Sequence, residues 1–361
     1  MRVTAKLGSG LRAVPGRLSP PWFLGGLAAL LLAVNLVAVG LGAMPVGWRQ
    51  IVALAGQPFG FGGELSLQEQ SVLLSIRLPR IALAVLAGAG LAVCGAALQA
   101  LFRNPLADPV LLGISSGAAL GAGLMMVVDS AGLPGPTRVL GGLAVPLAAF
   151  LGALAATGTT LALAVRRADR TPAATLLAGI AVNSLAMAGI GLVSYLADDA
   201  ALRNFTFWTL GSLAGATWPV LAPVALLVGA ALARLLGRAA ALNALLLGEA
   251  EAGHLGIDVA RLKLEVIVLS ALTVGAVVAV SGVIGFIGLV APHLVRLSIG
   301  PDHRVLLPGA ALAGALLLSA ADLGARTLAV PAELPIGLLT ALLGAPFFMW
   351  LLRRPRAESG H

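Results

Sequence analysis

Residues 80–101 read RIALAVLAGAGLAVCGAALQAL, and the only charge in this stretch is Arg80 at its start. A helix rises about 1.5 Å per residue, so a run of roughly 20 apolar residues crosses the ~30 Å hydrocarbon core of a bilayer. The glycines and alanines between the leucines and valines let neighbouring membrane helices approach closely, where van der Waals packing drives their association. The stretch therefore predicts a membrane-spanning helix packed among other helices.

The composition extends this prediction to the whole chain. Of its 361 residues, 59% are hydrophobic and 11% are charged, whereas soluble proteins carry about 25% charged residues. The net charge of +8 raises the question of nucleic-acid binding, but the basic residues form short clusters between apolar runs, as in membrane proteins. The single cysteine, Cys94, excludes a disulfide framework within one chain. We expect membrane lipid as the main surrounding and no nucleic-acid partner.

Ten apolar runs predict an all-α membrane protein with ten transmembrane helices and both termini on the same side. The expected spans are 22–43, 80–101, 106–128, 139–165, 172–197, 217–237, 262–282, 283–297, 305–322 and 336–352. With these spans, 17 of the 23 lysines and arginines fall on the side of the N-terminus, and the positive-inside rule makes that side cytoplasmic. We read residues 1–21 as a cytoplasmic leader rather than a cleaved signal peptide, 22–354 as one transmembrane domain and 355–361 as a cytoplasmic tail.

Two connections are long enough to carry structure of their own. Residues 44–79 form a polar, glycine-rich outer connection, and residues 238–263 form an inner one. In the inner connection leucines recur at helical spacing until Gly248, and a second short helix is expected from Glu249 to Leu255 with Gly256 as its C-terminal cap. Such a pair of helices, at about 241–258, suits docking of a soluble partner, and an ordinary surface loop is the alternative.

Several ordered blocks of sequence then point to a known family. They are RLPR at 77–80, GAALQALFRNPLADP at 95–109, LGISSGA at 112–118, GVIGFIGLVAPHLVR at 282–296, DHRVLLP at 302–308, ELPIG at 333–337 and GAP at 344–346. Together they resemble the iron-siderophore, haem and cobalamin permeases of ABC importers, over most of the chain from about 70 to 354. The resemblance implies the architecture of a type II ABC importer permease, located in the bacterial inner membrane.

The resemblance also implies partners. It predicts a homodimer with a central pore, two cytoplasmic ATPase subunits and a periplasmic binding protein that delivers the substrate. The chain has no G-x-x-x-x-G-K-S/T loop, so we expect that it binds no ATP and is not itself an enzyme. ATP and Mg²⁺ are expected to act in the partner ATPase, and no cofactor, metal site or catalytic residue is expected in this chain.

Site residues follow from matching positions in the family. The resemblance assigns binding-protein docking to Arg77, Arg80 and Arg326, because arginine offers a rigid fork of donors to carboxylates. The alternative is that they anchor helix ends at lipid headgroups. Insertion into the ATPase is assigned to a second set: Gly248, Glu249, His254, Leu255 and Gly256.

The resemblance also implies that the fifth span, Leu176–Leu196, and the short helix after it, Asn204–Gly215, line the translocation path. The path residues implied by the resemblance are Leu176, Ile180, Asn183, Ser184, Met187 and Leu210, and the cytoplasmic gate is placed at Arg170, Thr171, Pro172 and Ala173. Asp108 and Asp322 lie in or beside spans, where they either cap helices and pair with arginines or relay protons. We favour capping and pairing.

The substrate is the least determined property. Segments 204–215 and 256–263 look most similar to the haem permeases, so the sequence favours an iron chelate and haem in particular. His293 and His303 lie in blocks that look common to the whole family, which makes them poor candidates for haem ligands. A ferric siderophore and cobalamin remain open alternatives, as does a gradient-driven secondary transporter with broken helices near the membrane midplane.

Overall fold

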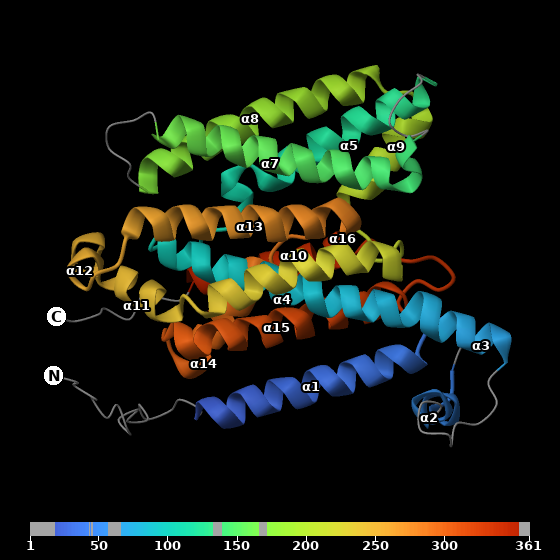
Figure 1. Cartoon of the computed structure of the whole chain (residues 1–361). Coiled ribbons are helices and arrows are strands. Elements are labelled where there is room, and N and C mark those ends of the chain that lie inside the picture. Colours follow the sequence, from blue (N-terminus) through green and yellow to red (C-terminus); the bar gives the residue numbers. More distant parts are fainter. Residues whose placement is uncertain are drawn as a thin grey trace.

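The computed structural model of the protein describes residues 19–42, 44, 46–56, 66–132, 139–165 and 172–353. Within these ranges every regular element is helical, as predicted (Figure 1). The first elements are α1 (Pro20–Gly40), α2 (Trp48–Gly56), α3 (Leu67–Ser71), η2 (Val72–Arg77), α4 (Leu78–Leu101), η3 (Pro109–Leu112), α5 (Ile114–Ser130), η4 (Gly141–Leu143) and α7 (Ala144–Val165). They are followed by α8 (Pro172–Leu196), α9 (Asp199–Thr209), α10 (Trp218–Leu236), α11 (Ala239–Leu247), α12 (Glu249–His254), α13 (Val259–Ser281), α14 (Ile287–Ile299), α15 (His303–Ala325) and α16 (Ile336–Arg353).

Each of the ten predicted spans coincides with a helix. Among the described residues, seven helices are long and apolar enough to cross a membrane, and the apolar helices α5, α14 and α16 are shorter. With 13 residues, α14 reaches only about 20 Å at 1.5 Å per residue. The preceding turn, 282–286, is non-helical, and a membrane protein tolerates such backbone at membrane depth only where protein or a cavity surrounds it. Here it packs against the chain, because a Cβ on Gly282 would lie 2.0 Å from the carbonyl oxygen of Trp208 in α9.

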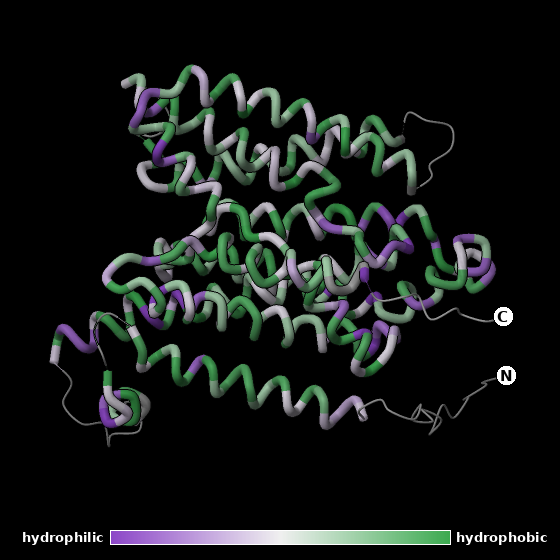
Figure 2. Tube along the Cα trace, turned by 180° about the vertical axis from the view of Figure 1, so that it is seen from behind, coloured by the Kyte–Doolittle hydropathy of each residue, from purple (hydrophilic) through white to green (hydrophobic). Residues whose placement is uncertain are grey.

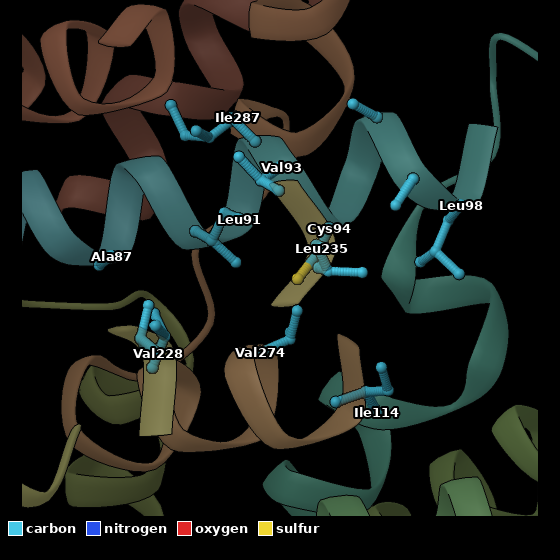
Figure 3. Close-up of a cluster of buried hydrophobic side chains, with 14 of the residues drawn as sticks. Ala87, Leu91, Val93, Cys94, Leu98, Ile114, Val228, Leu235, Val274 and Ile287 are labelled. Carbon is cyan, nitrogen blue, oxygen red and sulfur yellow. The ribbon is translucent and has the colours of Figure 1, made fainter. Parts of the chain in front are cut away.

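Helix α4 forms the centre of the bundle. Most of its side chains are buried, and Figure 3 shows Leu91, Cys94 and Leu98 facing side chains from α5, α10, α13 and α14. A Cβ on Gly88 would collide with the carbonyl of Gly314 in α15, so the two helices touch backbone to backbone. The small residues of the opening stretch thus serve close packing, as the sequence predicted.

The layers around α4 are distinct. In Figures 1 and 2, α5, α7, α8 and α9 form a group on one flank, α1 lies alone on the opposite flank, and α4, α10, α13 and α15 lie between them. Helices α11 and α12 lie at one end of the bundle, which we call the α12 end. Helices α2, α3 and α9 lie at the other, which we call the α3 end.

The connection predicted over 44–79 is wrong in its last part, from Leu67 onward. A capping box between Ser66 and Glu69 starts a helix there, and that helix continues through η2 into α4. The π-turn has a local cause: Pro79 has no N–H and its ring crowds the carbonyl one turn earlier, so a wider turn relieves the conflict. Arg77 and Arg80 consequently lie within the helical rod and not in a loop.

The third span also begins later than predicted. The sequence suggested 106, but α5 starts at Ile114, after the 3-10 turn η3. The side chain of Asp108 accepts from the backbone N–H of Val110 at 2.8 Å, which confirms the predicted capping role. Gly113, with φ of +79°, then redirects the chain into α5.

Candidate functional site

At the α3 end, Arg77 holds the end of α1. Its guanidinium donates to the carbonyls of Val39, Gly40 and Met44, with an Nη1–oxygen distance of 3.0 Å for Gly40. The residue is only 4% exposed. Carbonyl oxygens at a helix C-terminus have no partner within the helix, and a cationic side chain with several N–H groups satisfies them. Arg77 therefore ties the rod of η2 and α4 to α1.

Arg80 is paired on both sides by carboxylates. Its Nε lies 2.8 Å from Asp322 in α15, and its Nη1 lies 2.8 Å from Glu333 in the turn before α16. Asp322 also faces Arg326 at 3.4 Å, and Arg326 donates to the carbonyl of Ala38 at 2.7 Å. The prediction that Asp322 pairs with arginines is confirmed. These contacts join α4, α15, α1 and the start of α16 into one network.

We call Arg77, Arg80, Asp322, Arg326 and Glu333 the arginine cluster. It borders a cavity of about 210 Å³ at the α3 end, so the three arginines predicted for docking do come together. All three are less than a tenth exposed, and each donates to groups of its own chain. Glu333, with a side chain 43% exposed, is the accessible charge. Docking by the arginines themselves stays a prediction.

At the α12 end, the two short predicted helices are present. Gly248 adopts φ of +131° between α11 and α12, and Gly256 adopts φ of +82° after α12, so both glycines occupy backbone conformations that favour glycine. The side chain of Glu249 lies 2.6 Å from Lys263 at the start of α13. His254 and Leu255 are exposed, with Leu255 at 65%. The segment 247–256, which we call the α12 knob, thus presents exposed apolar and polar side chains between two glycines with positive φ.

A second charged group supports the α12 end. Arg234 in the last turn of α10 and Arg238 at the N-cap of α11 both pair with Glu265 in α13, and the Nη2 of Arg238 lies 2.8 Å from its carboxylate. Gln99 in α4 is fully enclosed and links two further elements. Its Nε2 donates to the carbonyl of Gly288 at 3.3 Å, while Arg296 of α14 donates to its Oε1 at 2.7 Å. Sequence reasoning missed Gln99, although a glutamine within an apolar span is the signal that could have found it.

The predicted path residues divide between two places. Five of them share one face of α8, namely Leu176, Ile180, Asn183, Ser184 and Met187. In the single chain Ile180, Ser184 and Met187 are exposed on that face. The hydroxyl of Ser184 donates to the carbonyl of Ile180 at 2.9 Å. Leu210 instead is the C-cap of α9, and its carbonyl accepts from the N–H of Gly337 at 3.0 Å. The helix predicted over 204–215 is in fact α9, which begins at Asp199 and ends at Thr209.

The predicted cytoplasmic gate cannot be described in full. Arg170 and Thr171 lie outside the described residues, Pro172 begins α8, and Ala173 is exposed on its first turn.

Known proteins similar to this chain were found by sequence and by structure. Residues 30–354 match the FecCD transport family. The hemin transport system permease protein HmuU of Yersinia pestis is 46% identical over 343 residues, covering 95% of this chain and 98% of that protein. The cobalamin import system permease protein BtuC of Halobacterium salinarum is 40% identical, covering 90% of this chain and 84% of that protein.

Among solved structures, a metal-chelate type ABC transporter in an inward-facing conformation superposes with a TM-score of 0.79 at 33% identity. The match covers 92% of this chain and 99% of that one. A relative of similar length and a superposable fold both agree with ten membrane helices, α4 among them. The resemblance expected from the sequence blocks is confirmed, and the chain belongs to the FecCD transport family.

Proposed function

We propose that this chain is the membrane-spanning permease subunit of an ATP-driven importer whose substrate is haem. The observation that carries the proposal is the 46% identity to a hemin permease along almost the full length of both proteins. The exposed faces of α8 agree with it, since in a single chain they lie free for a second copy or a path. Alternating access would then be a rigid-body movement of packed helices.

The proposal includes the expected partners. We infer that the α12 end is cytoplasmic and that the α12 knob inserts into a partner ATPase, two of which would serve a homodimer in the inner membrane. The knob is supported on one side by the Lys263–Glu249 pair and ends in an exposed leucine, Leu255. A buried apolar anchor surrounded by polar contacts is a common basis of affinity between proteins. ATP and Mg²⁺ would act in that partner.

At the α3 end, we propose that the arginine cluster supports a periplasmic docking surface from beneath. Its guanidinium groups fix the end of α1 and the turn before α16, and Glu333 is the cluster member open to a partner. Arg80→Lys keeps the positive charge but loses the guanidinium that contacts Asp322 and Glu333 on two sides. Glu333→Gln keeps the other four members of the cluster and removes the exposed negative charge. Weaker binding-protein affinity for both variants supports this role; unchanged affinity for both contradicts it.

Uptake into proteoliposomes tests the main proposal. The chain is reconstituted with its ATPase, with binding protein inside or outside and ATP on the opposite side, and haem, cobalamin and a ferric siderophore are compared. ATP-dependent accumulation of haem, abolished by an ATPase variant that cannot hydrolyse ATP, is the expected result. Accumulation that follows a proton or sodium gradient without ATP would overturn the importer mechanism.

Cobalamin is the second candidate substrate, because BtuC proteins of several organisms are 40–43% identical to this chain. Accumulation of cobalamin but not haem would keep the importer and exchange its substrate.

A further inference from the structure

Behind the α12 knob, the side chain of Asn243 joins α11 to the first turn of α15. Its Nδ2 donates to Oδ1 of Asp302 at 2.6 Å. Its Oδ1 accepts from the backbone N–H of His303 at 2.9 Å and lies 2.9 Å from the Nδ1 of the same residue. An amide oxygen only accepts, so Nδ1 of His303 carries the hydrogen in this contact. One amide thus makes three contacts to two successive residues.

The chemistry of this junction requires an amide on α11 and an acceptor on α15. Asp302 is the N-cap of α15, and its Oδ1 also accepts from the backbone N–H of Arg304 at 2.9 Å. Burial raises the pKa of Asp302, but the hydrogen bonds from Arg304 and Asn243 outweigh it, so the pKa lies below its ordinary value. The carboxylate of Asp302 therefore accepts hydrogen bonds from Asn243 and from the backbone of Arg304. A carboxylate at position 243 could donate none.

The junction bridges two parts of the molecule that otherwise meet through apolar packing. Leu242 and Leu245 of α11 are fully buried in the core, whereas α12 follows Gly248 and is paired to α13 through Glu249. On the far side, α15 lies against α4 with the backbone contact at Gly314. Arg238, at the N-cap of α11, pairs with Glu265 of α13, whereas Asn243 makes the directional, hydrogen-bonded contact between α11 and the start of α15 among the described residues.

We propose that Asn243 is a positioning residue that transmits movement of the α12 knob to α15 during ATP-driven transport. This inference rests on the proposed importer function and adds the element that couples its two halves. Hydrogen bonds fix direction as well as distance, whereas leucine contacts allow sliding. When an ATPase displaces the knob, the amide obliges the first turn of α15 to follow, and α4 moves with it.

Three variants separate this role from a general effect on folding. Asn243→Asp keeps the acceptor for His303 and places a carboxylate against Asp302, so it removes one bond and adds repulsion. Asp302→Asn keeps the N-cap and an acceptor for Asn243, since asparagine caps helices as well as aspartate does. The double variant N243D/D302N restores a donor–acceptor pair with the roles exchanged.

The experiment measures substrate accumulated per ATP hydrolysed, using the full permease–ATPase complex with binding protein in proteoliposomes. We expect N243D to lower this ratio about fivefold or more while the complex still assembles and hydrolyses ATP. D302N is expected to match the wild type, and the double variant to recover most of the loss.

An unchanged ratio in N243D, or an equal loss in N243D and the double variant, would overturn the proposal. Loss of assembly in N243D without recovery in the double variant would also overturn it, by making Asn243 a residue of folding alone. The wild-type complex is the reference, and absence of ATP-driven uptake there would refute the importer function instead.

Discussion

The arginine cluster allows a quantitative prediction, because Arg80 contacts two carboxylates at the same distance in different surroundings. Asp322 and Glu333 each lie 2.8 Å from the guanidinium, but their side chains are 3% and 43% exposed. The two carboxylates therefore differ mainly in their exposure to solvent. Asp322→Ala and Glu333→Ala form a matched comparison on a single arginine.

The expected magnitudes follow from that difference. Asp322→Ala leaves Arg80 and Arg326 buried without their shared carboxylate, and breaking a buried pair by removing one partner costs about 3–5 kcal/mol. Glu333→Ala removes a half-exposed charge while Asp322 still holds Arg80, and exposed pairs contribute about 0–1 kcal/mol. We expect the first variant to be destabilised by several times as much as the second.

Denaturant titration of the purified protein in detergent, followed by tryptophan fluorescence, measures both free energies of unfolding. A double variant, Asp322→Ala with Arg80→Ala, should cost less than the sum of the two single changes, because it removes the uncompensated charge along with its partner. The reasoning is refuted if Glu333→Ala costs as much as Asp322→Ala. That result would mean that water reaches the whole cluster and that its arginines are free to meet another protein.

Three further predictions concern packing, the knob and a cap. Gly314→Ala forces α15 away from α4 and should cost about 1–3 kcal/mol in unfolding titrations, whereas Gly229→Ala, with open space around it, should be neutral or slightly stabilising. Gly248→Ala strains a backbone at φ of +131° and should reduce co-purification of the ATPase; Gly253→Ala, on the same knob, should leave it unchanged. Asp108→Ala removes the hydrogen bond to Val110 and should lower stability by about 1 kcal/mol, and a loss below a few tenths would discount the cap.

Features that depend on nearby residues could be predicted from the sequence. All ten spans follow from runs of apolar residues, and the α12 knob follows from leucine spacing and two glycines, Gly248 and Gly256. The cap at Asp108 likewise involves a partner two residues away. In each case the deciding interactions lie within one or two turns, so the order of residue types contains them.

Features that depend on distant residues could not be predicted. Arg80 and Asp322 are 242 positions apart, and no periodicity relates them. The partners of Arg77 are backbone carbonyls, which every residue carries, so the side-chain pattern gives no sign of them. The same limit applies to the resemblance that assigned these arginines to docking: matching positions in the sequence do not show whether a charge faces outward or pairs within its own chain.

Helix α15 connects the two polar regions, and its construction determines what it can transmit. At its start, Asp302 accepts a hydrogen bond from the amide of Asn243. Its last turn carries Asp322, which pairs with Arg80. Between them the helix lies against α4, where the contact between Gly88 and Gly314 leaves no room for the two backbones to approach further. Interfaces packed this closely shift between discrete arrangements and do not deform gradually. We therefore expect a displacement of the α12 knob to tilt α15 and α4 together, as a rigid pair, and this movement to reach the arginine cluster. N243D should then disconnect the α12 knob from the arginine cluster.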